Sequence, residues 1–438
     1  MKLFFKKIII LLLLAALLTI SMSSAKSPVV SAAEKYITIT DFALEIAEVI
    51  ELTTVSGLES SGYVNALVEK GIIKDGDFTS YTKYLTRGDA ALLLNRADEY
   101  LYGDTLDAEL VELALDKRIS DIGKIKASKR MDVAKAYLKG FIKGYSNGEY
   151  STDRTLKVNS KIMKTGALDC IKMLKNKVLR AKISPDGQLI RTTKLPKYAR
   201  YYPYILASYP NTYYDWKFDF EGQSSYNPRT GIRTPYENIK DYAAPVDVDK
   251  TTEFDDFASV KNEYLDIWVG KVRTYMETVF SADYRTINDK WVETILSTDY
   301  SYENDIVDEQ TKEEIEQYVA NMKKNKTIVE YSKVAVEGSS LYFFDGSYYL
   351  RTYVKYRIVS SNIKYGVDTD TKIAEKPYNN ILYTSFPLVD FTGFKLGIWK
   401  EGHFDIELSS YSEENGGNLG IFYAYLNEYF YAERRTDQ

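Results

Sequence analysis

The residues with the clearest chemical meaning lie where an apolar helical pattern begins, at residues 85–89 (LTRGD). Thr86 can cap a helix with its side-chain oxygen, and Asp89, three positions later, completes the spacing of a capping box. Arg87 stands between them, beside backbone N–H groups that the first turn of a helix leaves without intrahelical partners. A guanidinium next to free amides suits an anionic ligand, such as an acidic substituent on a sugar.

Patterns that carry catalytic chemistry are weak in the rest of the sequence. A single histidine, His403, excludes a histidine-clustered metal site and argues against a Ser-His-Asp triad, and we interpret it as a strand-edge residue. The lone cysteine, Cys170, lies in an apolar helical pattern and is interpreted as a small buried hydrophobe. Adjacent acidic pairs at 255–256 and 313–314 point in different directions on a helix and make no acid–base pair. The sequence therefore predicts no catalytic residue, no metal and no cofactor.

Length and charge narrow the class of protein further. The chain has 438 residues, of which 45% are hydrophobic, which is enough for more than one core and suggests two or three domains. It carries 57 basic and 62 acidic residues and a net charge of -5. Because phosphate binding needs a concentrated basic surface, nucleic acid is not expected as a partner.

The first 33 residues are predicted to be a secretory signal peptide. Lysines among the first seven residues precede an apolar run over 8–20, and small residues follow at 30–33. The alternative, a retained membrane anchor, is opposed by the shortness of this run, since a spanning helix needs about 20 residues. No second apolar run approaches that length, so we expect a secreted protein without a membrane partner after cleavage.

Internal similarity organises the region from 35 to 180. Residues 71–76 (GIIKDG) recur as residues 140–145 (GFIKGY), each after an amphipathic helix and each before an aromatic residue and a second helix. A glycine at the end of a helix can adopt the left-handed cap conformation, and a second glycine permits the tight turn that follows. These two copies span 56–104 and 119–178.

A third, partial copy lies at residues 36–55. Thr38 and Asp41 repeat the three-residue spacing of Thr86 and Asp89, and an apolar helical pattern follows them.

These motifs resemble the S-layer homology repeat family. That repeat has a Gly-Ile-Ile-x-Gly turn, an aromatic residue and a helix that opens Ile-Thr-Arg-Ala-Glu. Residues 85–89 match the opening with Asp89 in place of Glu, residues 144–150 (GYSNGEY) are similar to the segment Gly-Tyr-x-Asp-Gly-x-Phe, and residues 120–122 (SDI) are similar to Phe-x-Asp-Val. The resemblance covers residues 36 to 178, roughly a third of the chain.

The resemblance implies three repeats in a pseudo-threefold helical unit, with grooves that bind the secondary cell-wall polymer, often a pyruvylated glycan. It places the protein in the cell wall or surface layer, with surface-layer proteins as further candidate partners. The residues that it implicates in polymer binding or in shaping the groove are Thr86, Arg87, Asp89, Gly71, Gly76, Lys164, Gly140 and Gly144.

Two of the three copies depart from the family pattern. The second full copy has residues 163–166 (MKTG) at the helix opening, so that Lys164 keeps the charge but loses the bidentate fork of arginine, and the cap is lost. The partial copy has Ile39 at the position of arginine. One complete groove of three is therefore expected, and the alternative is a helical spacer that keeps the fold but has lost the ligand.

Residues 181–260 are predicted to form a connector rich in tyrosine and proline. Pro196, Pro203 and Pro210 prevent a long helix there. Tyrosines interleaved with lysine and arginine could stack sugars or bases, but we favour a half-buried segment packed over neighbouring domains.

Residues 261–438 are predicted to form an α+β domain with an antiparallel sheet, so the whole chain is a multidomain protein with an all-α repeat module first. An amphipathic helix is expected over 254–280, a second from Trp291, and a third over 311–323 opened by Thr311. Residues 350–358 alternate as a strand, and 382–388, 394–399 and 404–408 are further strand candidates. A cone-shaped fold like the nuclear-transport-factor-2 superfamily is one possibility.

Three functions remain open from the sequence. The first is a surface protein, anchored by the repeats, that displays a binding or structural domain. The second is a wall-anchored secreted enzyme acting on carbohydrate or peptidoglycan, which would need two carboxylates roughly 5 to 10 Å apart in a cleft. The third is a sensor or assembly protein that binds peptide partners by pairing at a sheet edge.

Overall fold

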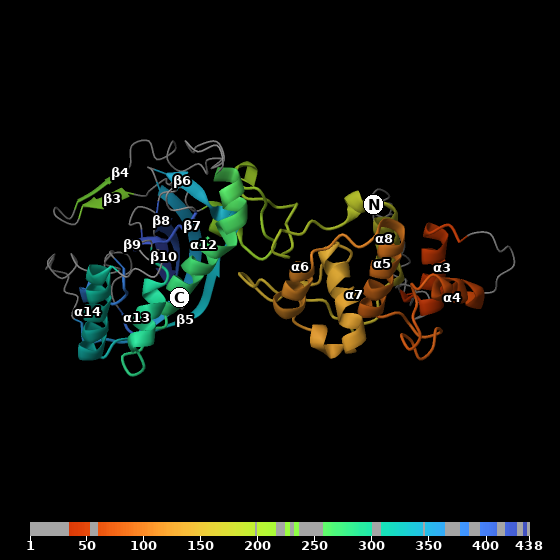
Figure 1. Ribbon diagram of the computed structural model, residues 1–438, viewed down its shortest axis with the longest axis horizontal. Coiled ribbons are helices and arrows are strands. Elements are labelled where there is room, and N and C mark those ends of the chain that lie inside the picture. Colours follow the sequence, from red (N-terminus) through yellow and green to blue (C-terminus); the bar gives the residue numbers. More distant parts are fainter. Residues whose placement is uncertain are drawn as a thin grey trace, which may run out of the picture. The chain divides into compact units, whose positions relative to one another are not determined.

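The chain is a mixed α+β protein in this computed structural model, and its sheets are antiparallel, which confirms the coarse fold prediction. Contacts divide it into two compact units (Figure 1). Unit 1 comprises Met1–Tyr145 and Arg154–Ala181, and unit 2 comprises Ser146–Asp153 and Lys182–Gln438. The structure describes residues 35–52, 60–197, 199–215, 224–227, 232–235, 257–299, 308–344, 347–363, 377–384, 395–409, 417–426 and 432–435. The predicted signal peptide lies outside the described residues.

Unit 1 is built from helices, with one pair of two-residue strands. The elements are α3 (Ile39–Val49), α4 (Ser60–Glu69), α5 (Arg87–Tyr102), α6 (Ala108–Leu113), α7 (Ala127–Leu138), α8 (Lys164–Lys175), β1 (Tyr145–Ser146) and β2 (Arg154–Thr155). Helix α5 is buried along most of its length and contacts both α7 and α8, so it is the central helix of the unit. Cys170 on α8 is buried, and burial raises the pKa of its thiol to about 11, which confirms its interpretation as a core residue.

Paired charges hold α5 to its neighbours. The guanidinium of Arg96 lies 2.6 Å from a carboxylate oxygen of Asp77 and 2.9 Å from one of Asp132, and all three side chains are largely buried. Asp98 on the same helix pairs with Lys139 at 3.1 Å and Arg180 at 2.5 Å. Because each charge has an opposite partner, this network is compatible with burial.

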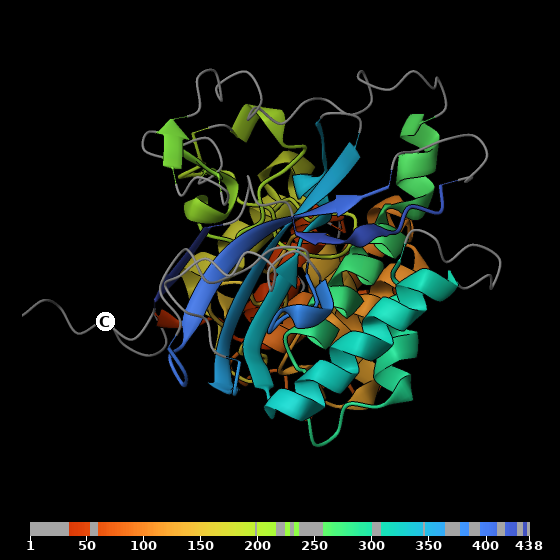
Figure 2. The ribbon, with the colours of Figure 1, turned by 90° about the vertical axis from the view of Figure 1, so that its left-hand side faces the viewer.

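In unit 2, helices cover one face of a six-stranded antiparallel sheet, as Figure 2 shows. The helices are α12 (Phe257–Val279), α13 (Asp289–Leu296) and α14 (Glu309–Asn325). The strands are β5 (Ile328–Val336), β6 (Tyr342–Phe344), β7 (Ser347–Ser360), β8 (Lys400–Leu408), β9 (Ile421–Leu426) and β10 (Ala432–Arg435). They follow the order β10-β8-β7-β5, with β6 beside β7 and β9 beside β8; β3 (Ser224–Asn227) and β4 (Ile232–Pro235) form a separate hairpin.

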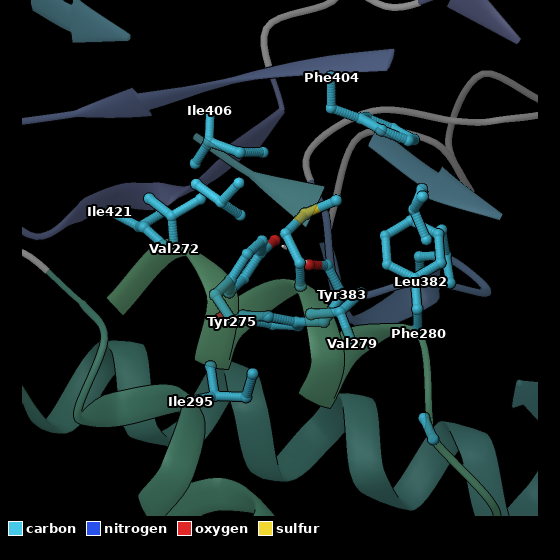
Figure 3. Close-up of a cluster of buried hydrophobic side chains, with 14 of the residues drawn as sticks. Val272, Tyr275, Val279, Phe280, Ile295, Leu382, Tyr383, Phe404, Ile406 and Ile421 are labelled. Atoms are coloured by element: carbon cyan, nitrogen blue, oxygen red, sulfur yellow. Dashed lines mark hydrogen bonds between the residues drawn. The ribbon is translucent and has the colours of Figure 1, made fainter. Parts of the chain in front are cut away.

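The main core of unit 2 lies between α12 and this sheet (Figure 3). Trp268, Val272 and Tyr275 on α12 are buried, as the predicted apolar face requires. They share one cluster with Phe280 and, from the sheet, with Phe404. Two tyrosine hydroxyls in this core donate to backbone carbonyls, that of Tyr275 to Tyr383 at 2.6 Å and that of Tyr318 to Ile381 at 2.8 Å, so these hydroxyls are satisfied although they are buried.

The structure corrects some predicted boundaries. Helix α14 begins after Asp308, whose carboxylate accepts from the backbone N–H groups of Gln310 and Thr311, so Asp308 and not Thr311 is the cap. The strands predicted at 382–388 and 394–399 are wrong for the described residues 382–384 and 395–399, which form turns, and the remaining positions lie outside the described residues. The candidate at 404–408 is confirmed within the longer β8.

The second face of the sheet is covered around Arg351 and Tyr353, which the alternation in β7 did not predict. Arg351 and Tyr353 point away from the main core yet are 2% and 3% exposed, because the tyrosine-rich segment after residue 199 packs over them. The hydroxyl of Tyr213 donates to the carbonyl of Arg351 at 2.6 Å. Tyr150 stacks on Tyr353 with ring centroids 3.7 Å apart and planes 9° from parallel. The segment thus contributes to the core of unit 2.

A buried ion pair links two central strands beneath this layer. Arg351 on β7 donates to both carboxylate oxygens of Asp405 on β8 at 2.8 Å, and Asp405 is fully buried. His403, two positions before Asp405, pairs with both Tyr353 and Ala432, so it lies inside the sheet and not at an edge strand.

We predict that Asp405→Asn destabilises unit 2 by about 3 to 5 kcal/mol, because it leaves a buried guanidinium without its counter-charge. The matched control is Glu330→Gln, which breaks another cross-strand pair of the sheet, Arg357–Glu330, whose side chains are 36% and 42% exposed. That control should cost less than about 1 kcal/mol. Urea unfolding measures both values, and equal losses would contradict the assignment.

A second prediction concerns Glu337, which is 3% exposed next to the same layer. Burial raises the pKa of this carboxyl to about 8, although hydrogen bonds from the backbone N–H and hydroxyl of Ser339 oppose the rise. The folded state therefore keeps a proton that the unfolded chain loses near its usual pKa of 4.5. The free energy of unfolding of unit 2 should fall as pH rises from about 5 through 8.

The variant Glu337→Gln removes this titration while keeping the size of the side chain. Its stability should depend less on pH between 5 and 9 than that of the unsubstituted protein, as measured by urea midpoints. Parallel pH profiles for the two proteins would show that Glu337 is not the responsible group.

Candidate functional site

Three extended segments of unit 1, immediately before α3, α5 and α8, pair with one another in a closed ring. The bridged residues are Tyr36 with Met163, Thr38 with Tyr84, and Thr86 with Lys161. The middle residues of the segments, Ile37, Leu85 and Ile162, are at most 5% exposed. The backbone N–H of Leu85 donates to the carbonyl of Ile37 at 2.9 Å, and that of Ile162 donates to Leu85 at 3.0 Å. The ring therefore brings three helix starts to one place.

The helix starts differ in their caps as the sequence predicted. The Thr86 hydroxyl accepts from the backbone N–H of Asp89 at 3.1 Å and donates to its carboxylate at 2.7 Å. Thr38 makes the same pair of contacts with Asp41. Helix α8 follows Met163 and has no side-chain cap, and Lys164, its first residue, is exposed.

Arg87 lies in a cationic and aromatic cluster with Tyr145 and Lys157. Its Nε donates to the backbone carbonyl of Leu156 at 2.6 Å, which fixes the guanidinium. The guanidinium carbon lies 5.3 Å from the centre of the Tyr145 ring, and Lys157 Nζ lies 4.1 Å from the same centre. Tyr145 is 47% exposed, so the cluster can be reached from solvent. Two cations thus flank one accessible aromatic ring.

A second cationic and aromatic cluster lies on the three paired segments themselves. Lys161 Nζ lies 4.5 Å from the centre of the Tyr84 ring and 5.5 Å from that of Tyr36. The two tyrosine rings are 5.7 Å apart. Each of the three residues stands immediately before the buried middle residue of its own segment, so ring closure alone places them together.

The cations around the helix starts of unit 1 form no salt bridge with a carboxylate of the described residues. These cations are Lys35, Lys83, Arg87, Lys157, Lys161 and Lys164. The cations between α5 and α7 behave differently: Lys129, for example, lies 2.7 Å from Asp89. Asp89 is therefore engaged by Thr86 and Lys129 and forms no ion pair with Arg87.

The predicted glycines have separate roles. The carbonyl of Gly144 accepts from Arg154, and the glycine contacts Leu156, whose own carbonyl fixes Arg87. Gly140 packs against Ala181, whose N–H donates to it at 3.0 Å. Gly71 and Gly76 both have a φ near +75°, at 71° and 78°, which only glycine adopts easily.

The turn that carries Gly71 and Gly76 has contacts with other cations. Arg96 donates to the carbonyl of Ile72 at 3.3 Å, and Lys126 donates to that of Gly76 at 3.5 Å. The turn next to Arg87 is instead the one of the second copy, through Tyr145 and Leu156.

Sequence reasoning missed the aromatic and lysine partners of the site. Tyr145 lies within the quoted segment 144–150, but nothing in a single sequence shows that it meets Arg87, which is 58 positions earlier (145 minus 87). One signal for Lys161 and its partners was available in the sequence. An alignment of the three segments on Ile37, Leu85 and Ile162 puts Tyr36, Tyr84 and Lys161 at the same position.

One of the two adjacent acidic pairs falls within the described residues. The acidic pair at 255–256 lies outside them, and the pair at 313–314 lies on a solvent-facing part of α14. No group of three or more His, Cys, Asp or Glu side chains in the described ranges is arranged to hold a metal ion. None of the described helices combines the length and apolar character that crossing a membrane requires.

Comparisons with known proteins give no assignment: no family model, no curated protein and no solved structure matches this chain.

The glycine contacts generate a stability prediction. A Cβ on Gly140 would lie 2.1 Å from the carbonyl oxygen of Ala181, at a φ of 78°. The equivalent Gly71 has a φ of 71° and open space around it. We expect Gly71→Ala to cost about 1 to 2 kcal/mol from backbone strain alone, and Gly140→Ala to cost clearly more. Thermal unfolding of unit 1 measures the difference, and equal costs would exclude the steric role of Ala181.

Proposed function

We propose that unit 1 attaches this protein to an anionic glycan of the bacterial cell wall and that unit 2 is the displayed part. The observation that carries the proposal is the solvent-accessible Tyr145 ring flanked by Arg87 and Lys157, neither of which has a carboxylate partner among the described residues.

The chemistry of this cluster suits an acidic sugar. A sugar ring can lie on the accessible part of the Tyr145 ring, since such a ring offers an apolar face. A carboxylate on that sugar can accept from the guanidinium of Arg87 and from the ammonium of Lys157. The cluster lies at the start of the 16-residue helix α5, where the helix dipole also favours negative charge.

The arrangement of the three segments supports the proposed relation to S-layer homology repeats. That family joins three repeats in a pseudo-threefold unit, and here three capped or formerly capped helix starts meet in one ring. Only α5 presents arginine at its first position, whereas α3 presents Ile39 and α8 presents Lys164. We therefore propose one strong attachment site, at Arg87, and expect a secreted, wall-associated protein with surface-layer proteins as further candidate partners.

Unit 2 is proposed as a displayed structural or binding domain, because several of its buried polar groups hold the fold together. Arg351 binds Asp405, and the hydroxyls of Tyr275 and Tyr318 bind backbone carbonyls at 2.6 and 2.8 Å.

The test is co-sedimentation of the purified protein with cell-wall sacculi, before and after the wall polymer is stripped. Arg87→Ala should weaken binding to intact walls about 10- to 100-fold, the equivalent of losing about 1.5 to 3 kcal/mol of charge-assisted hydrogen bonding. Stripped walls should bind neither protein.

The matched control is Arg130→Ala. Arg130 is also half-buried and its Nε also donates to a backbone carbonyl, that of Ile125 at 3.2 Å, but it lies at the start of α7. This control should bind as the unsubstituted protein does. Equal binding by Arg87→Ala, or equal losses in both variants, would contradict the proposed site.

A further inference from the structure

The two cationic and aromatic clusters of unit 1 are neighbours. Thr86, directly before Arg87, is bridged to Lys161, and paired residues of antiparallel segments have Cα atoms about 4.5 to 5.5 Å apart. The first cluster is Arg87 with Lys157 and Tyr145, and the second is Lys161 with Tyr36 and Tyr84. Because lysine and arginine have long side chains, one extended ligand can reach both clusters.

The second cluster has the chemistry of a binding site for a carboxylate on a ring. Lys161 is exposed, and its ammonium contacts two aromatic rings but no carboxylate of the described chain. Lys35 adds a second ammonium 5.4 Å from the Tyr36 ring. Both tyrosines are half-buried, so their rings are held in place while part of each faces solvent.

The two clusters also share a structural origin. The first depends on the start of α5 and on the segment after Tyr145, whereas the second exists only because all three extended segments close into a ring. The N-terminal partial copy lacks arginine at its helix start, yet it supplies Tyr36 to the second cluster, and Lys35 directly precedes it.

We propose that these clusters act as adjacent subsites for a glycan chain with acidic groups on neighbouring sugars, and not for a single acidic sugar at a chain end. This inference rests on the proposed function. Once one acidic sugar occupies the Arg87 cluster, the next acidic group lies at a high effective concentration near Lys161. Binding should therefore strengthen with the number of linked acidic sugars.

The balanced composition of the chain favours an acidic glycan over nucleic acid. The net charge is -5, and the unpaired cations gather around two compact clusters that fit two or three sugar units better than a long phosphate backbone.

The experiment is calorimetric titration of the whole protein with galacturonic acid and with oligogalacturonates of two, three and four units. Maltotetraose is the uncharged probe, and a deoxythymidine tetranucleotide is the nucleic-acid probe. For the unsubstituted protein, the dissociation constant should fall at least about 10-fold from the monomer to the best oligomer. Maltotetraose should not bind, and the tetranucleotide should bind more weakly than the oligogalacturonates.

Lys161→Ala should lose most of that gain while its affinity for the monomer changes less than about 2-fold, because the Arg87 cluster is intact. Lys161→Arg should keep the gain. The control Lys117→Ala removes an exposed lysine that is paired with Asp116 and should behave as the unsubstituted protein.

An affinity that does not rise with chain length, an unchanged gain in Lys161→Ala, or tighter binding of the tetranucleotide each overturns the inference. The failure of the proposed function is a separate result: it appears as equal binding of Arg87→Ala to intact walls. If wall binding requires Arg87 but the gain in affinity with oligomer length is the same in Lys161→Ala, the proposed attachment is supported and the second subsite is excluded.

Discussion

Backbone pairing among the three extended segments is the constraint on which unit 1 depends. Each segment has only a few residues, so none could form a stable sheet alone. Their closure around Ile37, Leu85 and Ile162 buries three apolar side chains and satisfies backbone groups at the same time. The same closure brings three helix starts into one region. It also brings together the cations that lie next to each helix start in the sequence. Positive charge from separate segments is thereby brought together, and within the described residues these cations form no salt bridge.

Unit 2 depends on a different solution, in which one face of the sheet and the part of the other face around Arg351 are buried. Apolar helices cover one face, and the other carries a layer of tyrosines, including Tyr209, Tyr213 and Tyr214. A tyrosine can enter such a layer because its ring packs while its hydroxyl can bond to the backbone: that of Tyr213 donates to the carbonyl of Arg351, and that of Tyr214 accepts from the N–H of Leu206. The layer shields the pair Arg351–Asp405 from water and makes its two hydrogen bonds necessary. This is a use for tyrosine that composition alone could not distinguish from sugar stacking.

Local features of the fold could be predicted from the sequence, whereas features that join distant segments could not. The caps at Thr38 and Thr86, the buried face of α12 and the core face of β7 follow from spacing within a single element. The burial of Arg351 and Tyr353 does not, because the tyrosines that cover them come from a segment more than a hundred residues earlier. In the candidate site, Arg87 was found from its position in a motif, but Tyr145 and Lys157 join it from a segment more than fifty residues later. Lys161 is brought beside Thr86 by the pairing of the extended segments.

The loop around Tyr150 has a practical consequence for how this chain can be divided. Residues Ser146–Asp153 leave unit 1 in the middle of its second copy, belong by their contacts to unit 2, and return. Tyr150 is held there with a φ of 59°, by a backbone bond to Ser208 and by its stacking on Tyr353. The chain consequently passes between the units at three points, so no single cleavage separates them. A recombinant fragment of the helical unit would carry an aromatic side chain stripped of its partners, unless the excursion is replaced by a short turn.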